Sequence, residues 1–288
     1  MSLNNIYLGA SEAINKAYLG DSIVYTRGTG NETEVDTLLA QATTDGYTAC
    51  SGSVLTALNT LVAALKTDGI WTKLDALYIM ATNGDSDFAC YNVKDPTSFN
   101  LTKVNSPTFT SLEGFTGNGS TSYLDTNYTP STDGVNFLQN NASLFFYNRV
   151  GRTGGGSEYD FAAEQGSNQA MLTVHFNDSF RPVIRINSSS AIINGTTGRE
   201  TGFQLATKAN SNSLAYYNDG VLANSATIPS NQDRPNLNLF LLARNTGSAS
   251  LFSTKQMSIA GVGADLTTEQ GDFYTAINAY MTTLGTNV

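Results

Sequence analysis

The stretch from about Asn83 to about Ala264 is a succession of short segments, each of strand length and rich in β-branched or aromatic residues. Gly, Asn, Ser or Pro bounds the segments, and these residues adopt the backbone conformations of tight turns. Many short strands without helices between them predict an antiparallel sandwich. The clearest segments are SYLDTNY, ASLFFYNRV, QAMLTVHF, FRPVIRIN, FQLATKA, SLAYYNDGVLA and LNLFLLARN.

One of these segments also predicts its own turn. In YYNDGVL, Asp219 and Gly220 stand between two apolar runs. Both central positions of a two-residue hairpin turn favour residues that tolerate positive φ. We therefore expect a tight hairpin here.

Residues 33–80 follow a helical pattern, with apolar residues three and four positions apart. Gly46 and Gly69 are expected to end two helices, and Ser51 or Ser53 to begin the second. IWTKLDALYIMA follows as a further buried element of this helical region, with Ile70, Leu74 and Leu77 on one side. The expected buried faces of the two helices are Val35, Leu38, Leu39 and Ala42, then Val54, Leu55, Leu58, Leu61, Val62 and Leu65.

A last helix is expected from Leu266 to Gly285, with Thr267 as its cap. An isolated helix of this length is only marginally stable in water. We therefore expect it to fold back onto the helical region around Leu58, Leu61 and Leu65. Its apolar face is Phe273, Ile277, Tyr280, Met281 and Leu284.

The first 28 residues contain two similar nine-residue segments, IYLGASEAI (Ile6 to Ile14) and AYLGDSIVY (Ala17 to Tyr25). In each copy, Tyr-Leu-Gly supplies a short strand, and Gly9 or Gly20 supplies a turn residue free to take positive φ. This module either docks onto a larger assembly or caps the helical region as a hairpin. Its unpaired strand edges also favour a homo-oligomer or association with partner subunits.

The expected fold class is mainly β, an antiparallel sandwich preceded by a short β module and a few helices and closed by a C-terminal helix. The expected division is a β module over 1–28, a helical subdomain over 29–82, the sandwich over 83–265, and a helix over 266–288 that packs back on the helical subdomain.

The composition excludes several classes of function. The formal net charge is −9, and no basic run is present, which argues against a partner bound through nucleic-acid phosphates. Charged residues are 14%, against roughly 25% in typical soluble proteins. No run approaches ~18 consecutive apolar residues, so membrane insertion is not expected. The start MSLNNIYLGASEAINK lacks the pattern of a secretory signal, which predicts synthesis and folding in a cytoplasm.

The metal- and thiol-bearing residues are few. Cys50 and Cys90 are the two cysteines, and a reducing cytoplasm favours buried thiols over a disulfide. His175 is the one histidine, in a strand-like segment without an identifiable catalytic partner. One His and two distant Cys do not make a zinc site without carboxylates. No cofactor is expected.

The carboxylates of SEYDFAAEQG are candidates for a glycosidase pair, which consists of two carboxyl groups that flank the glycosidic bond. Glu158 and Asp160 alternate on one face, but Glu164 lies six residues from Glu158. At ~3.3 Å per residue this separation is ~20 Å along a strand, beyond the ~5 Å of a retaining pair and the ~6.5–9.5 Å of an inverting pair. We expect no catalytic residues here.

Two further motifs predict turns rather than binding sites. NGDSDF offers Asp85 and Asp87 at alternate positions but lacks the further ligands of a calcium loop. GRTGGGSEY (Gly151 to Tyr159) has glycines but no Lys-Ser/Thr after them, so it does not match a phosphate-binding loop. Glycan binding is compatible with 14 Tyr and 14 Phe, but most aromatic residues in strands belong to the core, so no binding residue is assigned.

The region LAYYNDGVLA, LNLFLLARN and FSTKQMSIAGVGADLTTEQ resembles the concanavalin A-like jelly roll, in its laminin G-like and pentraxin-like branch. The wider arrangement resembles structural proteins of tailed bacteriophages. That likeness rests on the IYLG…INKAYLG…IVY start, on LKTDGIWTKLDALYIMATNG, and on NLTKVNSPTFTSLEGFTGNGSTSYLDTNYTPS, and it covers nearly the whole chain.

This resemblance implies a non-enzymatic virion component, such as a head or tail fibre, decoration or baseplate protein. Residues 1–28 would dock onto other virion proteins, and the sandwich would face outward toward host-surface glycans. The alternative is a carbohydrate-active enzyme or a free lectin of the same superfamily.

Overall fold

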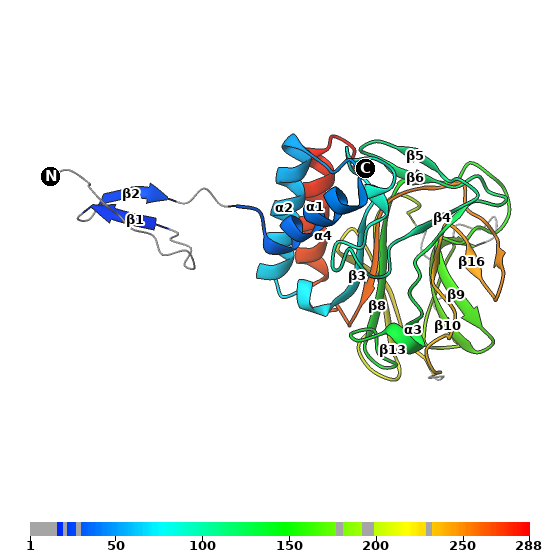
Figure 1. Ribbon diagram of the computed structural model, residues 1–288. Coiled ribbons are helices and arrows are strands. Elements are labelled where there is room, and N and C mark those ends of the chain that lie inside the picture. The colour runs from blue at the N-terminus through cyan, green and yellow to red at the C-terminus, as the bar shows by residue number, and fades with distance from the viewer. Residues whose placement is uncertain (1–15, 20–21, 27–29, 177–180, 192–198, 229–231) are drawn as a thin grey trace.

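The computed structural model describes residues 16–19, 22–26, 30–176, 181–191, 199–228 and 232–288 of the 288-residue chain. Figure 1 shows two stacked β-sheets with a layer of helices against one of them. The expected fold class is confirmed, because the chain is mainly β, forms a two-sheet sandwich and ends in a helix.

The first sheet has the strand order β14-β13-β12-β8-β18-β6-β5, with β3 paired to β18. The second sheet has the order β11-β10-β9-β15-β7-β4, with β16 paired to β9 and β17 to β16. Within the described residues, the strands of both sheets pair antiparallel except β16 with β9. The strands of the first sheet are β3 (Leu74–Ile79), β5 (Thr108–Thr110), β6 (Gly114–Thr116), β8 (Ala142–Val150), β12 (Gly202–Lys208), β13 (Ser213–Asn218), β14 (Val221–Thr227) and β18 (Gln256–Gly263). Those of the second are β4 (Thr102–Val104), β7 (Tyr123–Asp125), β9 (Phe161–Gln165), β10 (Asn168–Phe176), β11 (Arg181–Ile186), β15 (Phe240–Leu241), β16 (Arg244–Asn245) and β17 (Ala249–Ser250).

The sequence of strand β8 is apolar at successive positions because both faces of the strand are buried. Side chains alternate between the two faces of a strand. Leu144 and Phe146 belong to the core between the sheets, whereas Phe145 and Tyr147 belong to the core under the helices. The first sheet is therefore covered on both faces, and its central strands have no polar face.

The hairpin of YYNDGVL is confirmed. Strands β13 and β14 pair through Asn218 and Val221. Asp219 and Gly220 between them have φ of 47° and 73°, as a turn with two positive φ values requires.

Helices α1 (Thr33–Asp45), α2 (Gly52–Thr67) and α4 (Gln270–Thr283) lie on the outer face of the first sheet (Figure 1). Phe273 of α4 meets Phe145 and Phe203 of the sheet edge-on, with ring centroids 4.7 and 5.0 Å apart. Short turns of helix also occur at α3 (Pro130–Asp133), Trp71–Lys73 and Phe88–Cys90. Within the described residues, each helix is too short or too polar to span a bilayer.

The helix boundaries follow the sequence signals with one exception. Gly46 ends α1 with a φ of 78°, and Ser51 is the N-cap of α2. Helix α4, however, begins after Glu269 and not at Thr267. The Thr267 hydroxyl instead donates a hydrogen bond to Asp265 Oδ1 (2.5 Å). Helix α4 lies against α2, and its Tyr280 hydroxyl donates to the Ala81 carbonyl (2.7 Å).

The helical prediction for residues 33–80 was wrong at its end. Residues Leu74–Ile79 form β3, which pairs with β18. A short apolar run does not distinguish a buried strand from a buried helix by periodicity. Ala76 and Tyr78 point into the core between the sheets, and Leu77 and Ile79 point under the helices. The helical region thus contributes a strand to the sandwich.

The N-terminal module is described only in its second copy. Strands β1 (Lys16–Leu19) and β2 (Ser22–Thr26) pair antiparallel, so this copy forms a hairpin by itself. Figure 1 shows the hairpin apart from the sandwich and the helices. The first copy, with Gly9, and the turn residue Gly20 lie outside the described residues.

Candidate functional site

Glu158 lies in the loop before β9 and is 3% exposed. Its Oε2 accepts hydrogen bonds from the Ser253 hydroxyl (3.1 Å) and the Thr254 backbone N–H (2.8 Å). Its Oε1 accepts one from the Thr254 hydroxyl (2.9 Å). Both oxygens are therefore used to hold two loops together.

Asp160 is completely buried and forms an ion pair with the equally buried Lys255. Lys255 Nζ is 2.9 Å from Oδ1 and 2.8 Å from Oδ2. Oδ2 also accepts hydrogen bonds from the Thr173 hydroxyl and the Val174 backbone N–H, both at 3.0 Å. This carboxylate is a structural group that ties β10 to the residue preceding β18.

Glu164 has different surroundings from the other two carboxylates. It lies in β9, where Phe161 and Ala163 point into the core between the sheets. Alternation places Glu164 and Ala162 on the outer face of the second sheet. Glu164 Oε2 pairs there with Arg244 Nη1 at 3.2 Å. The three carboxylates of SEYDFAAEQG thus have three separate sets of partners.

Glu164 belongs to a group of polar side chains on that outer face, which we call the outer-face cluster: Tyr159, Glu164, Gln169, Arg185 and Arg244. The strand register brings these residues together. Gln169 pairs with Glu164, Arg185 pairs with Met171, Met171 pairs with Ala162, and Ala162 pairs with Arg244.

Hydrogen bonds fix the geometry of the outer-face cluster. Gln169 Nε2 donates to the Gly166 carbonyl (2.6 Å) and to Glu164 Oε1 (3.4 Å). Arg185 Nη1 donates to Gln169 Oε1 (2.7 Å). The Arg244 guanidinium carbon lies 5.3 Å from the centre of the Tyr159 ring. The side chains of Glu164 and Arg244 remain 24% and 25% exposed, so a ligand can reach them.

The floor of the cluster is apolar. Ala162, Met171 and Val183 pack together with Tyr159 on the outer face of the sheet, and all four are buried. Burial raises the pKa of the Tyr159 hydroxyl, whereas the positive charges of Arg244 and Arg185 lower it.

The remaining candidate residues have structural roles. Asp85 accepts backbone hydrogen bonds from Thr48 (2.6 Å), Asp87 (3.1 Å) and Phe88 (2.8 Å). Asp87 instead pairs with Lys103 at 2.8 Å. In the described part of the chain, no group of three or more His, Cys, Asp or Glu side chains is arranged to hold a metal ion.

Cys50 and Cys90 are buried thiols that form no disulfide, and Cys90 Sγ donates a hydrogen bond to the Ser86 carbonyl (3.2 Å). Burial raises their pKa to about 11 and about 12, so neither is a reactive thiolate at neutral pH. His175 lies in β10, but its side chain is outside the described part of the structure. The loop Gly151–Tyr159 is held by the Arg152 and Thr153 backbone N–H groups, which donate to Glu200 and Thr254.

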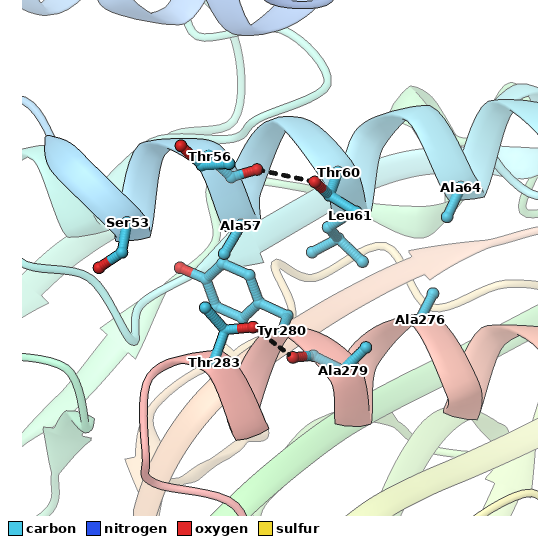
Figure 2. A pocket seen from close by; sticks show the side chains of 10 residues that line it. All are labelled: Ser53, Thr56, Ala57, Thr60, Leu61, Ala64, Ala276, Ala279, Tyr280 and Thr283. Carbon is cyan, nitrogen blue, oxygen red and sulfur yellow. Dashed lines mark hydrogen bonds between the residues drawn. The ribbon is translucent and has the colours of Figure 1, made fainter.

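A groove of ≈350 Å³ lies between α2 and α4 (Figure 2). Small residues line it, and the hydroxyls of Thr60 and Thr283 donate to carbonyls of their own helices. Among the described residues, the lining is made of hydroxyl, methyl and other apolar groups, and its one titratable side chain is Tyr280, whose hydroxyl already donates to the Ala81 carbonyl. A shallower hollow of ≈410 Å³ beside β13 and β14 is lined, among the described residues, by small side chains and Leu214, without an aromatic or charged group.

No protein-family model matches this sequence, and the comparison with curated proteins gives no match. Among solved structures, the chain is similar to a Trypanosoma rangeli sialidase in complex with a difluoro-nononic acid. The TM-score is 0.52 at 12% identity, over 78% of this chain and 40% of that one. The likeness shows the sandwich fold.

Two binding domains of toxins are also similar. The botulinum neurotoxin serotype D binding domain gives a TM-score of 0.47 at 11% identity, over 72% of this chain and 52% of that one. The binding domain of Paraclostridial Mosquitocidal Protein 1 gives 0.48 at 12% identity, over 73% and 53%. This chain thus spans less than half of the sialidase chain and about half of each toxin-domain chain.

Proposed function

We propose that this chain is a non-enzymatic, glycan-binding component of a tailed-phage virion, of the fibre, decoration or baseplate type. The outer-face cluster carries the glycan-binding part of the proposal. The resemblance of the chain to structural proteins of tailed bacteriophages supports the virion part.

The outer-face cluster has the chemistry that sugars require. Sugar hydroxyls donate and accept hydrogen bonds at once, and planar polar side chains such as those of Glu164, Gln169 and Arg244 offer both kinds of partner. The side chains are already fixed by hydrogen bonds to each other, which lowers the entropy lost on binding. A rigid sheet positions them above an apolar floor.

The carboxylates support a binding role over hydrolysis. Most glycosidases use two carboxyl groups that flank one glycosidic bond. Glu158 and Asp160 are buried with their oxygens hydrogen-bonded, which leaves Glu164 as the exposed carboxylate of this segment. The alternative, a carbohydrate-active enzyme, therefore lacks a second carboxylate at this place.

The remaining parts of the proposal concern assembly. Residues 1–28 attach the chain to other virion proteins, and the hairpin of β1 and β2 supplies strand edges for that contact. The chain acts in the virion as a homo-oligomer or beside partner subunits. Portal, capsid or tail genes beside this one would support the assignment, whereas polysaccharide-utilisation genes would favour a free lectin or an enzyme.

A glycan array probed with the full chain tests the binding. We expect binding to a subset of glycans, with Glu164→Ala reducing it about tenfold or more, since a hydrogen bond to a charged group is worth ~1.5–3 kcal/mol. Gln169→Ala should reduce it about two- to tenfold, since a neutral hydrogen bond is worth ~0.5–1.5 kcal/mol. Thr56→Ala, in the groove between the helices, is the control and should bind normally. Absence of binding across the array, or equal binding by all three variants, would refute the proposal. Release of reducing ends from a bound polysaccharide would favour the enzyme instead.

A further inference from the structure

Arg185 forms no ion pair with a described carboxylate. Its Nη1 donates to Gln169 Oε1 at 2.7 Å and contacts Met171 Sδ at 3.7 Å. Its Nε is buried and has no hydrogen-bond partner. A guanidinium offers five N–H donors, so protein partners use only part of the hydrogen-bonding capacity of Arg185.

The other arginines with described side chains have stronger partners. Arg149, Arg152, Arg199 and Arg244 each form an ion pair with a carboxylate. Arg234 has no carboxylate, but it donates to three backbone carbonyls. Within the described residues, Arg185 is thus the arginine held only by a neutral amide and a thioether.

The surroundings of Arg185 favour an anion. The outer-face cluster contains two guanidinium groups, those of Arg185 and Arg244, and one carboxylate, that of Glu164, so it carries a net positive charge. The whole chain has a net charge of −9. Negatively charged polymers are therefore repelled by the molecule as a whole, and an attraction to them must come from a local site.

We propose, on the basis of the proposed glycan binding, that the outer-face cluster binds an acidic sugar. The anionic group of the sugar pairs with the Arg185 guanidinium, whose planar fork suits a carboxylate or a sulfate ester. Glu164, Gln169 and Arg244 bind the neighbouring hydroxyls. The apolar floor formed by Met171 and Val183 lowers the local dielectric and strengthens the charge pairing.

Matched polymers separate the charge from the rest of the sugar. Polygalacturonate, hyaluronan and polysialic acid are immobilised beside their carboxyl-reduced forms, and dextran sulfate beside dextran. Binding of the full chain is measured by biolayer interferometry at 20 and 150 mM NaCl. We expect at least one acidic polymer to bind about tenfold or more tightly than its neutral counterpart, because a charge-assisted hydrogen bond is lost in the neutral form. The carboxylated and sulfated pairs show which anion is preferred.

The variants locate the effect. Arg185→Gln should remove the preference for the acidic form, and Arg185→Lys should keep part of it, because the charge remains and the fork is lost. Arg149→Gln removes the same charge from the first sheet and should leave the preference intact. Thermal melts of the three variants check that each is folded.

Each outcome decides a separate point. Equal binding of acidic and neutral forms would refute the acidic-sugar proposal and leave glycan binding standing. An equal loss in Arg149→Gln and Arg185→Gln would refute the assigned site. No binding to any polymer, joined with a blank glycan array, would refute both the acidic class and the proposed function.

Discussion

Replacing Lys255 with Met tests how the buried ion pair contributes to the fold. The substitution keeps most of the side-chain volume and removes the charge. It leaves Asp160 completely buried, with hydrogen bonds from Asn148, Thr173 and Val174 but without a cation. Breaking a buried pair by removing one partner costs about 3–5 kcal/mol, because the remaining charge is uncompensated.

This loss is a large fraction of the stability of a typical domain, which is about 5–15 kcal/mol. At about 2–4 °C per kcal/mol for a chain of this size class, the melting temperature should fall by roughly 6–20 °C. Chemical denaturation monitored by circular dichroism measures the free energy of unfolding, and calorimetry measures the melting temperature.

Lys66→Met is the matched control. Lys66 pairs with Glu32 and Glu34 on the surface, with its side chain 37% exposed. Exposed pairs contribute about 0–1 kcal/mol, so this variant should unfold almost like the native chain. The double variant Lys255→Met/Asp160→Asn removes the orphaned charge and should be more stable than Lys255→Met alone. A Lys255→Met chain as stable as Lys66→Met would refute the reasoning.

Three further predictions concern the packing of the core. Truncation after Asp265 removes α4 and exposes the apolar side chains that Phe273 covers, Phe145 and Phe203 among them. Burial of a side chain of this kind is worth about 1.5–3 kcal/mol, so the product should be insoluble or molten; cooperative melting at the native temperature would contradict this. In Gly261→Ala, the new Cβ would collide with backbone and ring atoms of the adjacent strands, and we expect a loss of about 1–3 kcal/mol in denaturant titrations. Because burial raises the pKa of Cys50 and Cys90 to about 11 and about 12 from 9.0, a thiol reagent at pH 8 should label neither in the folded chain and both in urea. The raised pKa values also make the free energy of unfolding depend on pH. Their contribution to stability should be complete below pH 9 and should be lost as the pH rises through 11 to 12.

Local patterns in the sequence determined much of the fold. The hairpin could be predicted because Asp219 and Gly220 tolerate the positive φ values that its turn requires. The end of α1 could be predicted because Gly46 also tolerates a positive φ. The buried faces of α1, α2 and α4 followed from helical periodicity. These features depend on residues a few positions apart, so a single sequence records them.

Tertiary structure decided the secondary structure of Leu74–Ile79. The segment is apolar on all sides, which fits a buried helix and a buried strand equally. It became β3 because β18 offers an edge to pair with, while the helices and the second sheet cover its two faces. That edge is formed by residues nearly two hundred positions away in the chain.

The outer-face cluster was also beyond the sequence. In the sequence, the cluster is marked by charged or amide side chains within the strand segments, such as Gln169 and Arg185. Many exposed strands carry such side chains, so they do not indicate a binding site. Glu164 meets Arg244 across a separation of 80 residues, and only the order β11-β10-β9-β16 brings them together. Sequence spacing describes side chains on one strand, whereas a binding site on a sheet is made across strands, where the register of hydrogen-bonded neighbours sets the distances.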